Sequence, residues 1–112
     1  MGAGGSAQIV DEALQAIRGR WKLAIVFHLM GAPRLRFNEL QRALEGVSQK
    51  VLTQAVRELE RDGIVERTVY DETPPHTDYR LTEVGMALQL ALRALRDWNV
   101  ARSPERWTVG RK

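Results

Sequence analysis

The sequence predicts a mainly α-helical domain with one small β-hairpin, an α+β arrangement, and three observations lead to this prediction. Apolar residues recur at helical spacing from residue 8 to residue 61 and again after Thr82. Between these two regions the period changes to two, and branched and aromatic residues flank a loop that contains two adjacent prolines. A length of 112 residues suits a single domain with a core of its own.

Apolar residues at helical spacing predict four helices before the hairpin: residues 8–18, 21–30, 37–44 and 48–61. Gly19 breaks the first of these helices, and Gly31 with Pro33 ends the second. Residues 1–7 are small and rich in glycine, so we expect a flexible N-terminus before the first helix.

The helix over residues 48–61 separates into two faces when it is placed on a helical wheel. One face is an apolar stripe suited to a core: Val51, Leu52, Ala55, Val56 and Leu59. Ser48 can cap the first turn, and Gly63 can supply the left-handed stop. The opposite face carries polar side chains and cations: Gln49, Lys50, Thr53, Gln54 and Arg57. Such side chains can read base edges in a DNA major groove, but a solvated surface helix would have the same composition.

The elements on either side of this helix point to a winged helix-turn-helix. In the short helix before it, Asn38 and Gln41 have capping-box spacing, and a tight turn with Gly46 joins the two helices. After it, residues 64–70 and 76–81 read as two strands. A hairpin directly after a recognition-type helix is the wing of a winged helix, so we predict a winged helix-turn-helix with an extra helix at each end.

The last helix, over residues 82–98, has more apolar surface than one small domain can cover. Its apolar residues span about 240° of a helical wheel, whereas a stripe of about 100° suffices for docking. A second copy of the chain would cover the surplus, although a central core helix would show the same pattern. The residues expected at the interface of a homodimer are Ile9, Leu14, Leu88, Leu92, Leu95 and Trp98. Residues 8–98 are thus expected to form the winged domain with its dimerisation helices, and residues 99–112 a basic tail.

Composition and charge limit the function. The formal net charge of +3 and the pI near 9.8 permit binding to a polyanion. With no cysteine and two distant histidines, and without any phosphate-binding or catalytic motif, we expect no metal, no cofactor and no enzymatic activity. The sequence shows neither an export signal nor an apolar run long enough to span a bilayer, so we expect a cytoplasmic protein that does not contact the membrane.

Seven segments of the chain carry a family pattern: residues 19–21, 36–40, 47–53, 57–60, 62–67, 74–75 and 79–85. The RFNEL segment and the YRLTEVG segment are the most specific of them. In order and spacing, the seven segments resemble the HxlR-type winged helix-turn-helix transcriptional regulators, within the larger MarR-like group. The resemblance implies a small homodimeric DNA-binding regulator whose first and last helices build the dimer. It also implies base recognition by the helix from Ser48, and minor-groove or phosphate contact by the hairpin.

One departure from the family pattern concerns redox sensing. Many HxlR-type regulators carry a reactive cysteine followed by a proline just before the first helix, and Gln8 and Ile9 occupy those positions here. We therefore expect that this protein is not a cysteine-based redox sensor, which leaves the signal that it senses open.

Three large aromatic residues, Trp21, Phe27 and Trp98, are expected in one small apolar region between the terminal helices and the second helix. Packing within the core would explain them. The other interpretation is a pocket for a small-molecule effector between the subunits, since no thiol is available to sense a signal.

The partner that these patterns predict is double-stranded DNA with an inverted-repeat operator. The residues expected to touch DNA are Arg34, Arg36, Asn38, Ser48, Gln49, Lys50, Thr53, Gln54, Arg57, Arg67 and His76. The alternative is a winged-helix module that binds another protein through the same helix face. That face lacks the exposed aromatic anchor typical of protein hot spots, which favours DNA.

Overall fold

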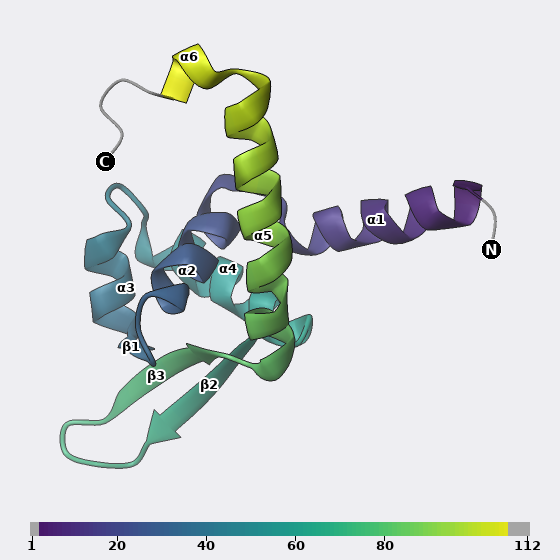
Figure 1. The fold of residues 1–112 in the computed structure, drawn as a ribbon. Coiled ribbons are helices and arrows are strands. Elements are labelled where there is room, and N and C mark those ends of the chain that lie inside the picture. Colours follow the sequence, from purple (N-terminus) through teal and green to yellow (C-terminus); the bar gives the residue numbers. More distant parts are fainter. Residues whose placement is uncertain (1–2, 108–112) are drawn as a thin grey trace.

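The computed structural model describes residues 3–107, and the elements in this range form one winged helix-turn-helix. In chain order they are α1 (Ala3–Ile17), α2 (Arg20–Met30), β1 (Leu35–Arg36), α3 (Phe37–Ala43), α4 (Gln49–Arg61), β2 (Val65–Tyr70), β3 (His76–Leu81), α5 (Glu83–Arg102) and α6 (Pro104–Trp107). Figure 1 shows α2, α3 and α4 gathered beside the small sheet, with α5 running along this body and α1 projecting away from it. The predicted mainly helical α+β class, with an extra helix at each end, is confirmed.

The sheet has three strands in the order β1-β3-β2, and all neighbours are antiparallel. The predicted hairpin is present, with Val65 opposite Leu81 and Tyr70 opposite His76. The sequence did not predict β1, which pairs Leu35 with Tyr79 on the other side of β3. A strand of two residues is too short to show a period, so only its tertiary pairing defines it.

Helix α4 begins and ends as its sequence predicts. The Ser48 hydroxyl oxygen accepts a hydrogen bond from the Val51 amide at 3.1 Å, which caps the first turn. At the other end Gly63 has a φ of 76°, and the Ile64 amide donates to the Leu59 carbonyl at 2.9 Å. This left-handed ending turns the chain directly from α4 into the wing.

The predicted cap of α3 is wrong. The helix begins at Phe37, so Asn38 lies inside the first turn instead of capping it. The N-cap is Arg36, whose backbone amide donates to the Glu39 carboxylate at 2.8 Å. Pairing in β1 holds Arg36 in an extended conformation, which makes the next residue the first that can turn into the helix.

Both terminal helices are longer than predicted. Helix α1 begins at Ala3, so residues 3–7, expected to be flexible, are helical, and residues 1–2 lie outside the described range. Helix α5 continues past Trp98 to Arg102 because no helix breaker occurs before Pro104, and α6 follows; residues 108–112 of the predicted tail lie outside the description. Across residues 3–107, no helix has both the length and the apolar character that crossing a membrane requires.

The core lies where α4 packs between the other helices and the sheet. The largest fully buried side chains come from α2, α3, α4 and β2: Ile25, Val26, Leu40, Leu52, Val56, Leu59 and Val65. Four of the five residues predicted for the apolar stripe of α4 are buried. Val51 is the exception, with 43% of its surface exposed, because it lies at the edge of the stripe that faces the start of α2.

The start of α5 is fastened to the turn between α4 and β2. The Thr82 hydroxyl oxygen accepts from the Gly85 amide at 3.1 Å and caps the helix. The Thr82 amide donates to the Ile64 carbonyl at 3.0 Å, and its hydroxyl donates to the Gly63 carbonyl. Gly85 lies so close to Ile64 that a Cβ at this position would collide with the Ile64 carbonyl oxygen.

The substitution Gly85→Ala is therefore expected to lower the free energy of unfolding by about 1–3 kcal/mol, since backbone must move to accept the added methyl group. Chemical denaturation followed by circular dichroism measures this change. Gly4→Ala is the matched control, because a Cβ there meets no atom within 4 Å and alanine favours the helix. Equal stability of the two variants would show that the junction tolerates a side chain.

Candidate nucleic-acid interface

The outer face of α4 gathers five of the predicted DNA-binding residues around one shallow hollow: Gln49, Lys50, Thr53, Gln54 and Arg57. All of them are exposed or half-exposed, because the core stripe of the helix faces the other way. Within residues 3–107, neither Lys50 nor Arg57 forms an ion pair with an acidic side chain. This face therefore offers two free cations beside hydroxyl and amide groups.

Gln54 is the member of this face whose side chain is already held. Its Nε2 donates to the Glu58 carboxylate at 2.7 Å, one helical turn further along. The other carboxylate oxygen of Glu58 lies 2.6 Å from the Lys22 Nζ at the start of α2. The hydrogen bond from Gln54 and the nearby Lys22 ammonium lower the pKa of Glu58 below its ordinary value. We did not predict this link, although the spacing of four residues between Gln54 and Glu58 is a signal for it.

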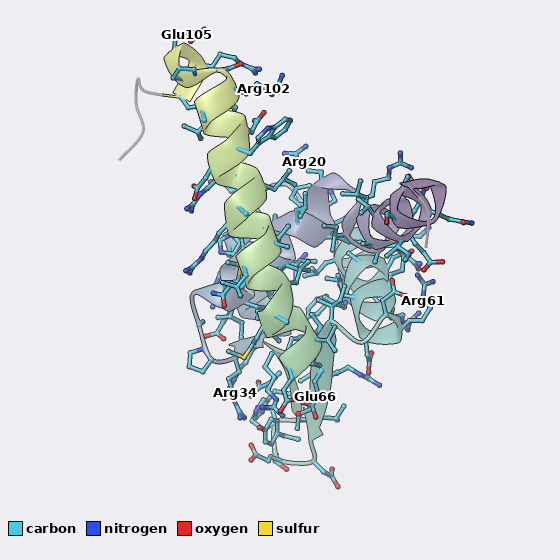
Figure 2. All side chains as sticks on the ribbon, turned by 45° about the vertical axis from the view of Figure 1, so that its right-hand side comes forward. Arg20, Arg34, Arg61, Glu66, Arg102 and Glu105 are labelled. Carbon is cyan, nitrogen blue, oxygen red and sulfur yellow. The ribbon has the colours of Figure 1, made fainter. Side chains whose placement is uncertain are left out.

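Two predicted phosphate contacts, Arg34 and Arg67, lie at the wing and have acidic neighbours. The Arg67 Nε is 3.6 Å from a Glu60 carboxylate oxygen, which joins β2 to α4. The Arg34 Nη1 donates to the Tyr70 hydroxyl and is 3.7 Å from a carboxylate oxygen of Asp78. Figure 2 shows Arg34 beside the sheet, at the end of the molecule away from Arg102. About half of each guanidinium-bearing side chain stays exposed, so both can still reach a phosphate.

His76, another predicted contact, packs within the wing. Its ring stacks on Tyr70 with centroids 4.5 Å apart, and only 18% of the side chain is exposed. Its Nε2 lies 3.8 Å from Asp78, and its Nδ1 lies 3.6 Å from Glu72. Asp78 is buried, and its Oδ1 has no hydrogen-bond partner among the described residues. The sequence analysis did not single out Asp78 or Tyr70. In the described part of the chain, no group of three or more histidine, aspartate or glutamate side chains is arranged to hold a metal ion.

The remaining predicted contacts lie around the start of α3 and the start of α4. Arg36 and Asn38 line a hollow with the wing residues Pro74, Pro75, His76 and Thr77. Ser48 is exposed but its oxygen is used to cap α4. The predicted residues thus fall into two adjoining surfaces, the outer face of α4 and the side of the wing, which the contact between Glu60 and Arg67 connects.

The residues predicted for a dimer interface do not all have the same environment. Ile9, Leu14, Leu95 and Trp98 have 47–60% of their surface exposed. Leu88 is half-buried against the core. Leu92 is only 5% exposed, so the prediction is corrected here: this side chain of α5 packs in the core of its own chain. Further apolar side chains on α1 and α5 are exposed that sequence reasoning did not single out: Val10, Val84, Met86 and Leu90.

Within one chain, the three aromatic residues that were predicted to lie in one region have different environments. Trp21 packs against the core with the Arg20 guanidinium over its ring, whereas Trp98 is 60% exposed on α5. Phe27 alone of the three lines a groove, of about 780 Å³, bordered by α1, α2, α5 and α6. Six residues along one helix separate Trp21 from Phe27, which places their side chains about 120° apart on α2.

Comparison with known proteins gives a consistent result. Residues 16–106 match the sequence profile of the family described as HxlR-like helix-turn-helix. An uncharacterized HTH-type transcriptional regulator of Bacillus subtilis (strain 168), YtcD, is 42% identical over 89 residues, which cover 80% of this chain and 70% of YtcD.

Solved structures of related regulators have the same fold. A transcriptional regulator of the MarR family from Enterococcus faecalis V583 superposes with a TM-score of 0.83 and 38% identity, covering 95% of this chain and 93% of that one. The reduced form of the redox regulator HypR gives a TM-score of 0.77 and 37% identity, covering 87% and 96%. From the profile match, these relatives and the winged fold, we conclude that the chain is a transcriptional regulator that belongs to the HxlR-like helix-turn-helix family.

Proposed function

We propose that this regulator binds double-stranded DNA as a homodimer and recognises an inverted-repeat operator. The observation that carries the proposal is the outer face of α4, where Lys50 and Arg57 make no ion pair with any described residue and lie beside three hydrogen-bonding side chains. A helix with this face can lie in a major groove and read base edges. Membership of a helix-turn-helix family supports the same role.

Each surface has its own task in this proposal. The α4 side chains read bases, since glutamine pairs with adenine and lysine or arginine pairs with guanine. Arg34, Arg36 and Arg67 hold the phosphate backbone on either side, and Asn38 in the first turn of α3 adds a neutral donor. Acidic neighbours already engage Arg34 and Arg67, so Arg36 is the wing-side cation that we expect to contribute most to affinity.

The homodimer is proposed from the apolar surface of α1 and α5. Figure 1 shows α1 leaving the body of the chain, and Ile9, Val10 and Leu14 on it are each about half exposed or more. Leu90 on α5 is 77% exposed. Large exposed apolar surface on two neighbouring helices is what a second copy would bury, and a two-fold dimer would place its recognition helices about one DNA turn apart.

We further propose that the protein has no enzymatic activity, and no cysteine-based redox switch because residues 1–112 contain no cysteine. The similar protein HypR is a redox regulator. Because this chain contains no cysteine, a redox response in it would need chemistry other than that of its own thiols. We also propose a cytoplasmic location, and a small-molecule effector as the signal in place of a thiol. A protein-binding winged-helix module is the alternative to DNA binding.

DNA binding is tested with duplexes selected from random sequence by the wild-type protein. Arg57→Ala is expected to reduce the preference for the selected duplex over a scrambled one by about 1–3 kcal/mol for each half-site. Arg36→Ala is expected to weaken both duplexes alike and to lower the slope of log affinity against log salt by about one for each copy. Fluorescence anisotropy at several salt concentrations measures both effects.

Arg93→Ala, which removes an exposed cation from α5, is the control and is expected to change neither quantity. A wild-type salt slope near zero would favour the protein-binding module. If Arg57→Ala weakens both duplexes equally, that side chain holds the backbone and does not read a base.

The dimer is tested by sedimentation of Leu90→Asp. Because Leu90 is 77% exposed in the single chain, the carboxylate should leave the fold intact. Burying it in an interface should raise the dimer dissociation constant about 100-fold, equivalent to about 3 kcal/mol. Arg42→Asp places the same group at an exposed position of α3, outside the proposed dimer surface of α1 and α5, and should leave the dimer intact. A wild-type monomer at micromolar concentration would contradict the proposal.

A further inference from the structure

We propose that Glu58 is a positioning residue for base recognition: it fixes the direction of the Gln54 amide and so decides which base edge Gln54 accepts. The inference rests on the proposed DNA-binding function. It assigns a role to a carboxylate that would otherwise be an unfavourable charge beside a DNA-binding face. The role depends on three side chains, Lys22, Gln54 and Glu58, which α2 and α4 bring into contact.

The direction of the Gln54 amide follows from the chemistry of its partner. The atom that lies 2.7 Å from the Glu58 Oε2 must be the amide nitrogen, since an ionised carboxylate only accepts hydrogen bonds. The amide oxygen of Gln54 therefore points away from Glu58. A glutamine without such a partner could rotate its amide by half a turn and exchange donor for acceptor at little cost.

Glu58 is itself held in place. Its Oε1 lies 2.6 Å from the Lys22 Nζ, and only 12% of the Lys22 side chain is exposed. Lys22 stands in the first turn of α2, a helix that contributes Ile25 and Val26 to the core. The pKa of Glu58 is lowered by the bond from Gln54 and by Lys22, so the group remains an ionised acceptor at neutral pH. Glu58, which holds the Gln54 amide, is thus itself held by a residue of α2 as well as by its own helix.

A fixed amide is a more selective reader than a free one. With one N–H engaged by Glu58, Gln54 presents its carbonyl oxygen and its second N–H in a set order. The oxygen requires a donor on the base edge, which adenine N6 and cytosine N4 supply in the major groove. Thymine and guanine present only acceptors there, so the second N–H could donate to them but the amide oxygen would be left without a donor. We therefore expect a preference for an amino-bearing base at the position that Gln54 reads.

The test compares base preference in four proteins: wild type, Gln54→Ala, Glu58→Gln and the double variant. Each is measured against the selected operator and against all single base-pair changes across one half-site. Gln54→Ala should flatten the preference at one base pair by about fivefold or more. Glu58→Gln keeps the shape of the side chain but can donate as well as accept, so it should reduce the preference at the same base pair to a similar extent. The double variant should lose no more than Gln54→Ala alone.

Glu60→Gln is the matched control, because it also removes a carboxylate that joins α4 to a neighbouring element, here β2. It leaves Lys22, Gln54 and Glu58 in place, so we expect an unchanged base preference at the position that Gln54 reads. Glu58→Gln should leave the salt slope of binding unchanged, because the carboxylate makes no phosphate contact.

The outcomes separate this inference from the proposed function. If Gln54→Ala weakens the base preference at a position where Glu58→Gln leaves it unchanged, Gln54 is oriented without Glu58. The inference is then overturned, while base recognition by α4 stands. If Gln54→Ala weakens the preference at no position although the wild type prefers its operator, Gln54 contacts no base and the inference is again overturned. If the wild type shows no salt-dependent binding to duplex DNA, the proposed function fails, and the inference fails with it.

Discussion

Burial of one stripe of α4 is the constraint on which the rest of the structure depends. Leu52, Val56 and Leu59 are fully buried, and each such side chain contributes about 1.5–3 kcal/mol to folding. A surface ion pair such as the one between Glu60 and Arg67 contributes about 0–1 kcal/mol. Burial of these apolar side chains, and not ion pairing, therefore sets the rotation of α4 about its own axis. Once the stripe is buried, the polar residues on the opposite side have no place other than the solvent-facing surface.

Elements with a strong repeat or a specific cap could be predicted from the sequence, and those defined by tertiary contacts could not. Ser48 and Gly63 delimit α4 as expected, because a hydroxyl cap and a left-handed glycine act locally. The strand β1 and the N-cap of α3 at Arg36 depend on pairing with β3, which no local pattern encodes. For the same reason the exposure of the outer face of α4 was predicted correctly, whereas the burial of Leu92 and the different environments of Trp21 and Trp98 were not.

Acidic residues accompany several of the cations at the proposed interface, and this bears on the balance of affinity and specificity. Glu60 and Asp78 lie within 4 Å of Arg67 and Arg34, and Glu58 holds Gln54. In the proposed complex, Glu60 and Asp78 would reduce the attraction between DNA phosphates and the two arginines, which would weaken binding to any sequence. The three carboxylates also limit the rotamers of the side chains that they hold. We expect such a surface to bind non-specific DNA less tightly while keeping the contacts that depend on exact placement.

The junction at the start of α5 connects the two halves of the proposed function. Thr82 is hydrogen-bonded to the carbonyls of Gly63 and Ile64, the residues between α4 and the wing, and Gly85 lies against the same backbone. The long α5 helix is therefore fastened to the end of the recognition helix. In the proposed dimer, α5 also packs on its partner, so the packing of the two copies sets the spacing of the two α4 helices. A change of that packing would alter the match to half-sites one helical turn apart, without any movement inside the winged domain itself.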